Sequence, residues 1–246
     1  MGGDILIYGA NGYTGRLVVE RALARGLRPV LAGRNRQAVE ALADETGLSS
    51  RVFDLKGRVA DELGGVGTVL HLAGPFSRTS VPMLDACLAA RAHYIDITGE
   101  IDVFEALAAR DAEAKTAGIA VLPGAGFDVV PSDCLAAHLK RRLPGAVSLD
   151  LVIGGLNDPS RGTTRTMLEG MAAGTRVREG GIIVELPEVP RGTADFGHGL
   201  KPTLGVSWGD VSTAWHSPGI PDISVFFEAS PPLERELGIP RPLRAL

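Results

Sequence analysis

Three glycines near the start of the chain have a spacing that suits the binding of a phosphate group. Gly9, Gly12 and Gly15 directly follow the apolar run Asp4–Tyr8 and precede an apolar-periodic segment, Arg16–Arg25. In such a strand–turn–helix unit the first glycine permits a sharp turn, the second lets the backbone approach a pyrophosphate, and the third allows close packing of the helix. Free N–H groups at the positive end of the helix dipole then face the anion. The pattern predicts a dinucleotide site rather than a plain structural turn, and the site includes the intervening residues Asn11, Tyr13 and Thr14.

The residue after the second expected strand bears on the choice of cofactor. That strand, Arg28–Ala32, is followed by Gly33 and Arg34. A fold that prefers NAD carries Asp or Glu here, about 20 residues after the glycines, to bind the ribose 2′-hydroxyl. A guanidinium at this position pairs with a 2′-phosphate instead, so Gly33 and Arg34 predict NADP. A solvated surface arginine is the alternative interpretation.

Two further strand ends complete the expected cofactor site, because ligands of such sheets bind outside the carboxyl ends of the strands. The third strand, Arg51–Asp54, ends at Asp54. The fourth, Thr68–Leu72, leads into a turn in which a glycine lets the nicotinamide ribose approach the backbone, formed by Ala73, Gly74, Pro75 and Phe76. His71 has a pKa near neutrality, but its place inside an apolar strand favours a hydrogen-bonded core histidine.

Two carboxylates are the candidates for acid–base chemistry. Glu100 follows Thr98-Gly99 at the start of an expected helix, beside the predicted nicotinamide site; a carboxylate that complements the helix dipole is the alternative. Asp128 lies in the glycine-rich loop Gly124–Asp128, where it either binds substrate or organises the loop. No Tyr is followed four residues later by Lys, so the proton-relay pair of the short-chain dehydrogenases is missing.

The elements that must position these residues alternate between strand and helix. The pattern predicts six strands joined by helices and short loops, with the last two at Tyr94–Ile97 and Ile119–Leu122. Asn35 is expected to cap a helix over Arg36–Thr46, and one long helix to run from about Asp102 to Ala117. Such an alternation folds as a doubly wound parallel sheet with right-handed crossovers, the Rossmann type of α/β fold.

The pattern shifts toward strands after Pro123, which predicts a second, smaller α+β domain that covers the open end of the cofactor site. After a helix from Pro131 to about Leu143, one further helix is expected from about Thr163 to Arg178. Strands are expected at Val147–Ile153, Ile182–Leu186, Val206–Trp208 and Ile223–Phe227. We assign residues 1–130 to the dinucleotide-binding domain and residues 131–246 to a domain for substrate binding or dimerisation.

Composition and charge narrow the class of protein. With 246 residues, 45% hydrophobic and 22% charged, the chain has the composition of an ordinary soluble globular enzyme. Its net charge of −4 provides no basic field, so we expect no nucleic-acid partner. Cys87 and Cys134 lack metal-ligand spacing, so we expect reduced thiols in the cytoplasm and no metal site. No apolar run approaches the ~20 residues that span a bilayer, and the first strand leaves no room for a signal peptide.

The strand-end sequences together resemble one family, the saccharopine dehydrogenase-like NADP-binding oxidoreductases, which include the bacterial trans-acting enoyl reductases. The resemblance is carried by Gly9–Gly15, Ala32–Arg34, Gly74–Phe76, His93–Glu100, Gly126–Asp133, Ser207–Ala214 and His216–Pro221. It implies reduction of C=N bonds in amino-acid metabolism or of polyketide-like enoyl intermediates. Family members are usually longer, with a further segment that returns to the first domain, so we expect a short variant or a truncated product.

The sequence therefore predicts an NADP-dependent oxidoreductase that transfers hydride between NADPH and a small or lipid-like acceptor, of the imine or enoyl type. Glu100 or Asp128 would orient the acceptor or relay a proton. The alternative from another class is a non-catalytic NADP(H)-binding sensor or scaffold, which the missing Tyr/Lys pair and the early C-terminus favour. Arg34 disfavours a protein that binds a nucleotide sugar or a methyl donor. Formation of a homodimer stays open.

Overall fold

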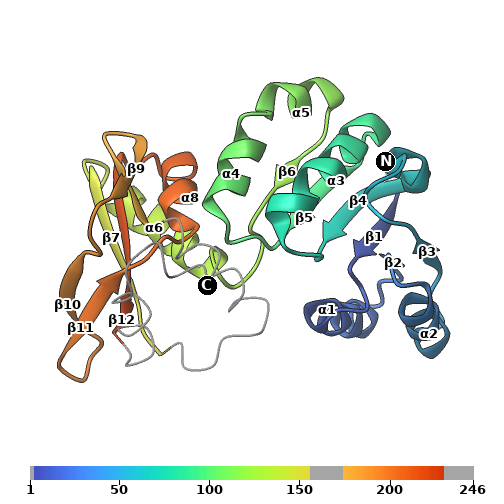
Figure 1. Cartoon of the computed structure of the whole chain (residues 1–246), viewed down its shortest axis with the longest axis horizontal. Helices are drawn as coiled ribbons and strands as arrows, with labels where there is room; N and C mark the ends of the chain where they lie inside the picture. Colours follow the sequence, from blue (N-terminus) through green and yellow to red (C-terminus); the bar gives the residue numbers. More distant parts are fainter. Residues whose placement is uncertain (1–2, 156–173, 230–246) are drawn as a thin grey trace. The chain divides into compact units, whose positions relative to one another are not determined.

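The chain folds into two compact units, each with its own sheet (Figure 1). The computed structural model describes residues 3–155 and 174–229. One unit takes in the chain to Thr98 together with Glu105–Gly126, and the other takes in Gly99–Phe104 and the chain from Phe127 onward.

The first unit is built on a parallel six-stranded sheet in the order β3-β2-β1-β4-β5-β6. Its strands are β1 (Asp4–Tyr8), β2 (Val30–Gly33), β3 (Ser50–Val52), β4 (Val66–His71), β5 (His93–Asp96) and β6 (Val121–Leu122). The strand order proceeds in opposite directions from β1 and β4, so the winding reverses between these two strands. This topology confirms the Rossmann-type doubly wound sheet that the alternating pattern predicts.

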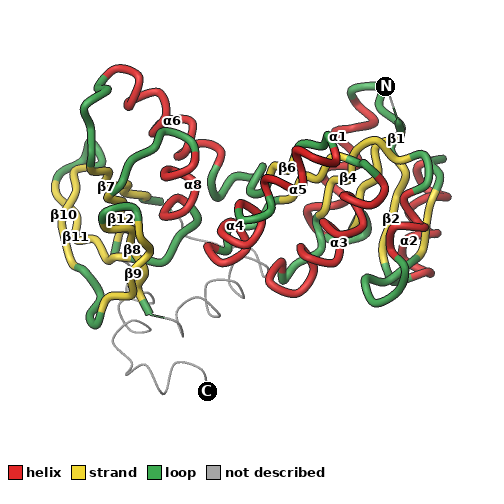
Figure 2. Tube along the Cα trace, turned by 90° about the horizontal axis from the view of Figure 1, so that it is seen from above, coloured by secondary structure: helices red, strands yellow, loops and turns green. Residues whose placement is uncertain are grey.

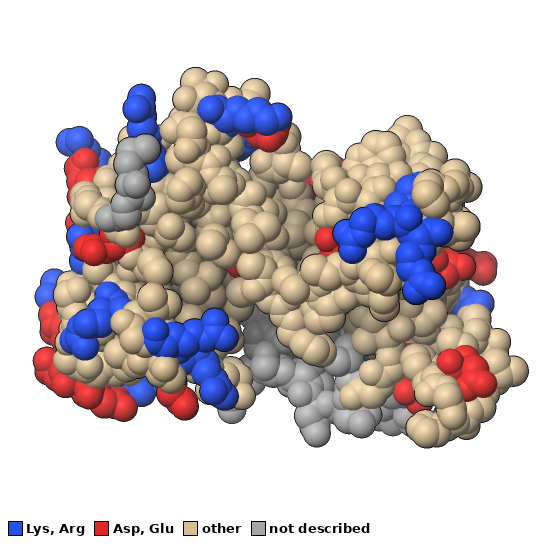
Figure 3. Space-filling view, turned by 180° about the vertical axis from the view of Figure 1, so that it is seen from behind, with Lys and Arg blue, Asp and Glu red and all other residues tan. Residues whose placement is uncertain are grey.

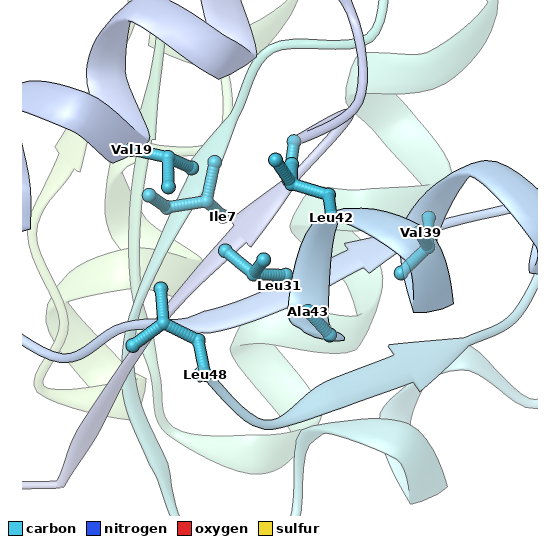
Figure 4. Close-up of a cluster of buried hydrophobic side chains, with 8 residues drawn as sticks. Ile7, Val19, Leu31, Val39, Leu42, Ala43 and Leu48 are labelled. Carbon is cyan, nitrogen blue, oxygen red and sulfur yellow. The ribbon is translucent and has the colours of Figure 1, made fainter. Parts of the chain in front are cut away.

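Helices cover both faces of this sheet (Figure 1). They are α1 (Tyr13–Ala24), α2 (Arg36–Thr46), α3 (Phe76–Ala90) and α5 (Asp111–Ala117), whereas α4 (Ile101–Ala108) begins in the residues assigned to the second unit. Figure 4 shows Ile7 and Leu31 packed with Val19 of α1 and with Leu42 of α2 in one apolar cluster. Tyr8 follows Ile7 in β1 and points to the opposite face of the sheet, because side chains alternate along a strand. Its ring lies against that of His71.

The ends of the helices follow local chemistry. Asn35 caps α2 as expected, since its side chain accepts a hydrogen bond from the Ala38 N–H at 3.1 Å. The single helix expected from Asp102 to Ala117 is wrong: the structure has α4 and α5, separated at Ala109 and Arg110. Asp111 and Glu113 stand in the first turn of α5, where acidic side chains stabilise a new helix N-terminus.

The second unit has a six-stranded sheet in which β7 is parallel to its neighbour β12 and the remaining pairs are antiparallel. Its strands are β7 (Ser148–Ile153), β8 (Thr175–Glu179), β9 (Ile182–Leu186), β10 (Arg191–Asp195), β11 (Leu200–Gly205) and β12 (Asp222–Glu228). Helices α6 (Val130–Arg142) and α8 (Asp210–His216) lie on one side of it (Figure 1 and Figure 2). The unit is of the α+β type that the sequence predicts.

Two expected elements of this unit differ from the structure. The helix expected from Thr163 to Arg178 lies outside the described residues up to position 173, but its last part is strand β8. Gly180 and Gly181, with φ of 55° and 84°, join β8 to β9 in a tight hairpin, which draws the preceding residues into a strand. The residues Val206–Trp208, expected to form a strand, do not form one; strand β11 precedes them and ends at Gly205.

Basic and acidic side chains are interspersed over the face drawn in Figure 3, consistent with the small net charge of −4. Within residues 3–155 and 174–229, the structure has no helix of the length and apolarity that a membrane span requires.

Gly15 offers a test of the packing of α1 on the sheet. A Cβ at this position would lie 2.3 Å from the Gly9 carbonyl oxygen, a backbone atom that cannot move aside. We expect Gly15→Ala to lower the free energy of unfolding by about 3 kcal/mol or more. Gly57→Ala is the matched control, since a Cβ there meets no atom within 4 Å and should change stability by less than about 1 kcal/mol. Urea denaturation measures both; equal midpoints for the two variants would contradict the packing argument.

Candidate active-site residues

The glycine turn between β1 and α1 brings three backbone segments into contact. Gly9 has a φ of 87°, and a Cβ on it would lie 3.0 Å from the carbonyl carbon of Leu72, so the turn presses against the end of β4. Gly12 starts α1, and a Cβ there would lie 3.3 Å from the Gly9 oxygen. Together with Gly15, these positions leave a backbone cradle that a side chain would fill.

The N-terminus of α1 is open to an anion. Among the residues that the structure describes, no side chain caps this end, and no acidic residue stands in its first turn. The first N–H groups of a helix have no acceptor within the helix, so those of Tyr13 and Thr14 are available to a phosphate. The Tyr13 ring is 77% exposed and leaves this end accessible. The cradle and the free donors fit the pyrophosphate of a dinucleotide.

The end of β2 lies beside the same turn. A Cβ on Gly33 would come 3.1 Å from the Asn11 Oδ1, so the Asn11 side chain reaches across from the glycine turn to β2. Arg34 is exposed, and within residues 3–155 and 174–229 its side chain has no hydrogen bond or ion pair. An unpaired guanidinium at this position is suited to a phosphate ligand.

The pKa of the Tyr8 hydroxyl depends on the charged side chains at this edge of the sheet. Its hydroxyl donates a hydrogen bond to the Phe53 carbonyl at 3.1 Å. Burial and the nearby Asp54 carboxylate raise the pKa of Tyr8, and the Arg34 guanidinium opposes them. Arg34 and Asp54 therefore both act on the Tyr8 hydroxyl. Asp54 itself is exposed and accepts a hydrogen bond from the Lys56 N–H at 2.9 Å.

A side-chain hydroxyl holds the turn after β4. The hydroxyl of Thr79, in α3, donates hydrogen bonds to the carbonyls of Ala73 and Pro75, at 2.8 and 3.1 Å. Helix α3 therefore fixes the conformation of this turn. The Gly74–Pro75 peptide bond is cis, and α3 begins directly afterwards at Phe76. The backbone of Gly74 carries no side chain that would keep a ribose away.

His71 is a core residue, as expected, but the expectation that it is hydrogen-bonded is wrong. The residue is fully buried, and neither Nδ1 nor Nε2 has a hydrogen-bond partner in the described part of the chain. Its ring lies among those of Tyr8, Phe76 and Tyr94, with centroids 5.4 to 6.2 Å away. Burial lowers the pKa of His71 to about 3, so the imidazole is neutral at physiological pH.

Asp96, at the end of β5, has a structural role. Its Oδ1 accepts hydrogen bonds from the N–H groups of Thr98 and Gly124, at 2.9 and 2.8 Å. Its Oδ2 accepts one from the Tyr94 hydroxyl at 2.5 Å. This buried carboxylate ties the ends of β5 and β6 together and fixes the backbone just before Gly99 and Glu100.

In the second unit, the segments that carry Glu100 and Asp128 lie side by side. A Cβ on Gly99, next to Glu100, would be 3.3 Å from the Asp128 Oδ2. The Trp208 indole N–H donates to the Asp128 carbonyl at 2.7 Å, which fixes the backbone on the other side. Burial raises the pKa of Asp128, so its carboxyl group holds a proton more readily than an exposed one.

One further acid has no assigned role in the sequence-based prediction. Asp210, the first residue of α8, is fully buried, and neither carboxylate oxygen has a hydrogen-bond partner in the described part of the chain. Burial is the main cause that raises the pKa of Asp210 to about 7. The sequence signal that could have identified Asp210 is its position in Ser207–Ala214, where this charged residue stands between Trp208-Gly209 and the apolar Val211.

The glycine cradle, the open N-terminus of α1 and the topology of the sheet define a dinucleotide-binding domain of the Rossmann class. A family model, the saccharopine dehydrogenase NADP binding domain, matches residues 5–122. These residues, just under half of the chain, are similar to that family of oxidoreductases, and they support a nicotinamide dinucleotide as the class of cofactor.

Curated relatives extend the similarity beyond this domain. The trans-acting enoyl reductase of Mycobacterium ulcerans is 31% identical over 155 residues, which cover 56% of this chain and 36% of that protein. The trans-acting enoyl reductase of Mycobacterium bovis is 28% identical over 225 residues, which cover 82% of this chain and 51% of that protein. This chain therefore spans between about a third and a half of the length of these relatives.

Solved structures share the fold. Saccharopine dehydrogenase (L-Glu forming) from Saccharomyces cerevisiae is 14% identical, with a TM-score of 0.67 over 96% of this chain and 57% of that chain. The WlbA dehydrogenase from Thermus thermophilus, solved with NAD and UDP-GlcNAcA, is 14% identical, with a TM-score of 0.52 over 99% of this chain and 77% of that chain.

The buried imidazole of His71 predicts a measurable dependence of stability on pH. Because the pKa is lower in the folded than in the unfolded chain, the folded state loses stability as the pH falls from about 6.5 toward 3. Between about pH 6.5 and about pH 5 this loss amounts to about 2 kcal/mol. We expect His71→Leu to remove it, as measured by amide hydrogen exchange of β1 and β4. An unchanged difference between the two pH values in the variant would show that His71 is not its source.

Proposed function

We propose that the protein is an NADP-dependent oxidoreductase that reduces an imine or enoyl-type acceptor. The observation that carries the choice of NADP is the exposed Arg34 at the end of β2, beside the glycine turn, which has no ion-pair partner among the described residues. Support for the acceptor type comes from the relatives named as trans-acting enoyl reductases, at 28 to 31% identity.

The cofactor-binding residues that we propose all stand at the carboxyl ends of β1 to β4. The backbone of Gly9 to Gly15, including Asn11, Tyr13 and Thr14, would hold the pyrophosphate at the N-terminus of α1. Gly33 and Arg34 would bind the 2′-phosphate, and Asp54 would lie at the adenosine end. The turn formed by Ala73, Gly74, Pro75 and Phe76 would approach the nicotinamide ribose. When bound, NADPH supplies a hydride to the acceptor.

The acid–base role falls to Glu100 or Asp128. Reduction of a C=C or C=N bond requires a proton as well as a hydride, and a positioned carboxylic acid is a suitable donor. Asp128 is the stronger candidate, because burial raises its pKa and two backbone segments fix its place. Glu100 would orient the acceptor from the neighbouring segment. We assign residues 1–130 to cofactor binding and residues 131–246 to substrate binding or dimerisation.

Arg34 provides the test of cofactor choice. Removal of a guanidinium that pairs with the 2′-phosphate should weaken NADPH binding by about 10- to 100-fold, and NADH binding hardly at all. Calorimetry on Arg34→Ala measures both affinities. Arg21→Ala is the matched control, because it removes an exposed arginine at the opposite end of α1 from the glycine turn. Equal losses for the two nucleotides would remove the assignment to NADP.

The acceptor is tested by NADPH oxidation with a panel of imines and enoyl thioesters. We expect Asp128→Asn to lower kcat by roughly 10²- to 10⁴-fold on the active acceptor while the affinity for NADPH stays the same. Glu100→Gln should mainly raise KM if Glu100 orients the acceptor. Tight NADPH binding without turnover of any acceptor would favour a sensor or scaffold instead.

A further inference from the structure

A cluster of buried polar groups lies where α8 meets α6. Besides the two oxygens of Asp210, the Oδ1 of Asp133 and the Oγ1 of Thr213 are buried without a hydrogen-bond partner in the part of the chain that the structure describes. The side chain of Asp210 has no exposed surface. Buried polar groups are nearly always paired, so an unpaired carboxyl group costs stability and calls for an explanation. Functional sites are where such a cost is retained.

Burial and two acidic neighbours favour the protonated form of Asp210. The Ser132 hydroxyl, which also donates to the Val129 carbonyl at 3.0 Å, and the Asp210 N–H lower the pKa of the carboxyl group and oppose this in part. The charges that face Asp210 from α6 and the loop before it are the carboxylates of Asp133 and Asp128. Burial, with these two negative charges, raises the pKa of Asp210 to about 7.

The buried cation on the sheet side of α8 is bound by other groups. Arg178 of β8 donates to the carbonyls of Val211 and Gly181, at 2.8 and 2.7 Å, and its guanidinium lies 5.4 Å from the centre of the Trp215 ring. His216, the other titratable group of α8, stands at the opposite end of the helix from Asp210. Among the described residues, Arg178 is thus bound by other groups, and burial remains the main cause that raises the pKa of Asp210.

The backbone before Asp210 is fixed against Asp128. Trp208 donates to the Asp128 carbonyl at 2.7 Å. A Cβ on Gly209 would lie 2.9 Å from the Val129 Cγ2, so the two chain segments are in close contact. Asp210 directly follows these two contacts in the chain, and it is buried whereas Asp128 is half-buried.

We propose that Asp210 is a positioning residue that stores the proton which Asp128 delivers to the acceptor. The inference rests on the proposed function. The O–H bond of Asp128 breaks as its proton bonds to the acceptor. The proton of Asp210 would then pass to the Asp128 carboxylate through the Ser132 hydroxyl, which lies near Asp210, and solvent would return one proton to Asp210. Each turnover consumes one solvent proton, and the carboxyl groups end as they began.

The test follows the proton by two measurements on the full chain. The first is the titration of the carboxyl carbons by NMR, with Asp210→Asn used to assign the signal, and it requires no turnover. We expect the Asp210 signal to change near neutral pH. The second is the pH profile of kcat for NADPH oxidation: in Asp210→Asn the fall in rate at high pH should begin about one pH unit lower, with about a tenfold loss at neutral pH.

Two further variants guard against a merely structural effect. Asp133→Asn should shift the Asp210 titration and the pH profile to lower pH, because it removes a negative charge that faces Asp210. This variant, with the wild-type titration, decides the question if Asp210→Asn does not fold. Asp150→Asn is the matched control, since it removes an exposed carboxylate of β7 and should leave both measurements unchanged.

The outcomes separate the inference from the proposed function. An Asp210 signal that is ionised from about pH 5 upward, or identical pH profiles in the wild type and in Asp210→Asn, would overturn the inference while turnover continued. If the wild-type protein reduces no acceptor while Asp210 still titrates near neutrality, the proposed function is overturned. The protonation of the buried Asp210 near neutral pH would still hold.

Discussion

The contact on which the first unit depends is that between Gly15 and the carbonyl oxygen of Gly9. A Cβ on Gly15 would lie 2.3 Å from that oxygen, so α1 can pack this closely on the end of β1 only because the side chain is absent. The same closeness aims the N–H groups of α1 at the turn, next to the point where the winding of the sheet reverses. The proposed anion site is therefore a consequence of this packing. The sheet in turn fixes the positions of the strand ends around it.

Two buried ionisable groups, His71 and Asp210, avoid a charge in the protein interior in the same way. His71 is neutral because its pKa is lowered to about 3, and Asp210 keeps its proton because its pKa is raised to about 7. Burial is the largest cause of both pKa shifts, although the Ser132 hydroxyl and the Asp210 N–H oppose it in part at Asp210. Their consequences differ. The uncharged imidazole serves the core of the sheet, whereas a carboxylic acid that titrates near neutrality has a proton to give.

Much of the first unit could be predicted from the sequence, because its signals are local. The glycines of the first turn, the Asn35 cap and the alternation of apolar strands and helices each depend on a few neighbouring residues. The break at Arg110 was missed because the apolar pattern runs on through it, although Asp111 and Glu113 mark a new helix start. Strand β8 was missed because its identity depends on the Gly180-Gly181 hairpin and on pairing with β9. The partners of a strand in a mixed sheet are distant in sequence, and no local pattern specifies them.

The carboxylates show most clearly what the sequence could not provide. Asp96 and Asp210 are both fully buried, and both stand in segments of similar pattern. Asp96 accepts three hydrogen bonds and is thereby fixed in a structural role. In the described part of the chain Asp210 has no comparable set of donors, and it faces two other carboxylates, so its protonated form is favoured. Residue type is the same in the two cases, so the difference between a structural and a chemical acid lies in the donors that the fold brings to each. Because those donors come from segments far apart in the chain, the role of Asp210 emerges only once α6 and α8 are seen together.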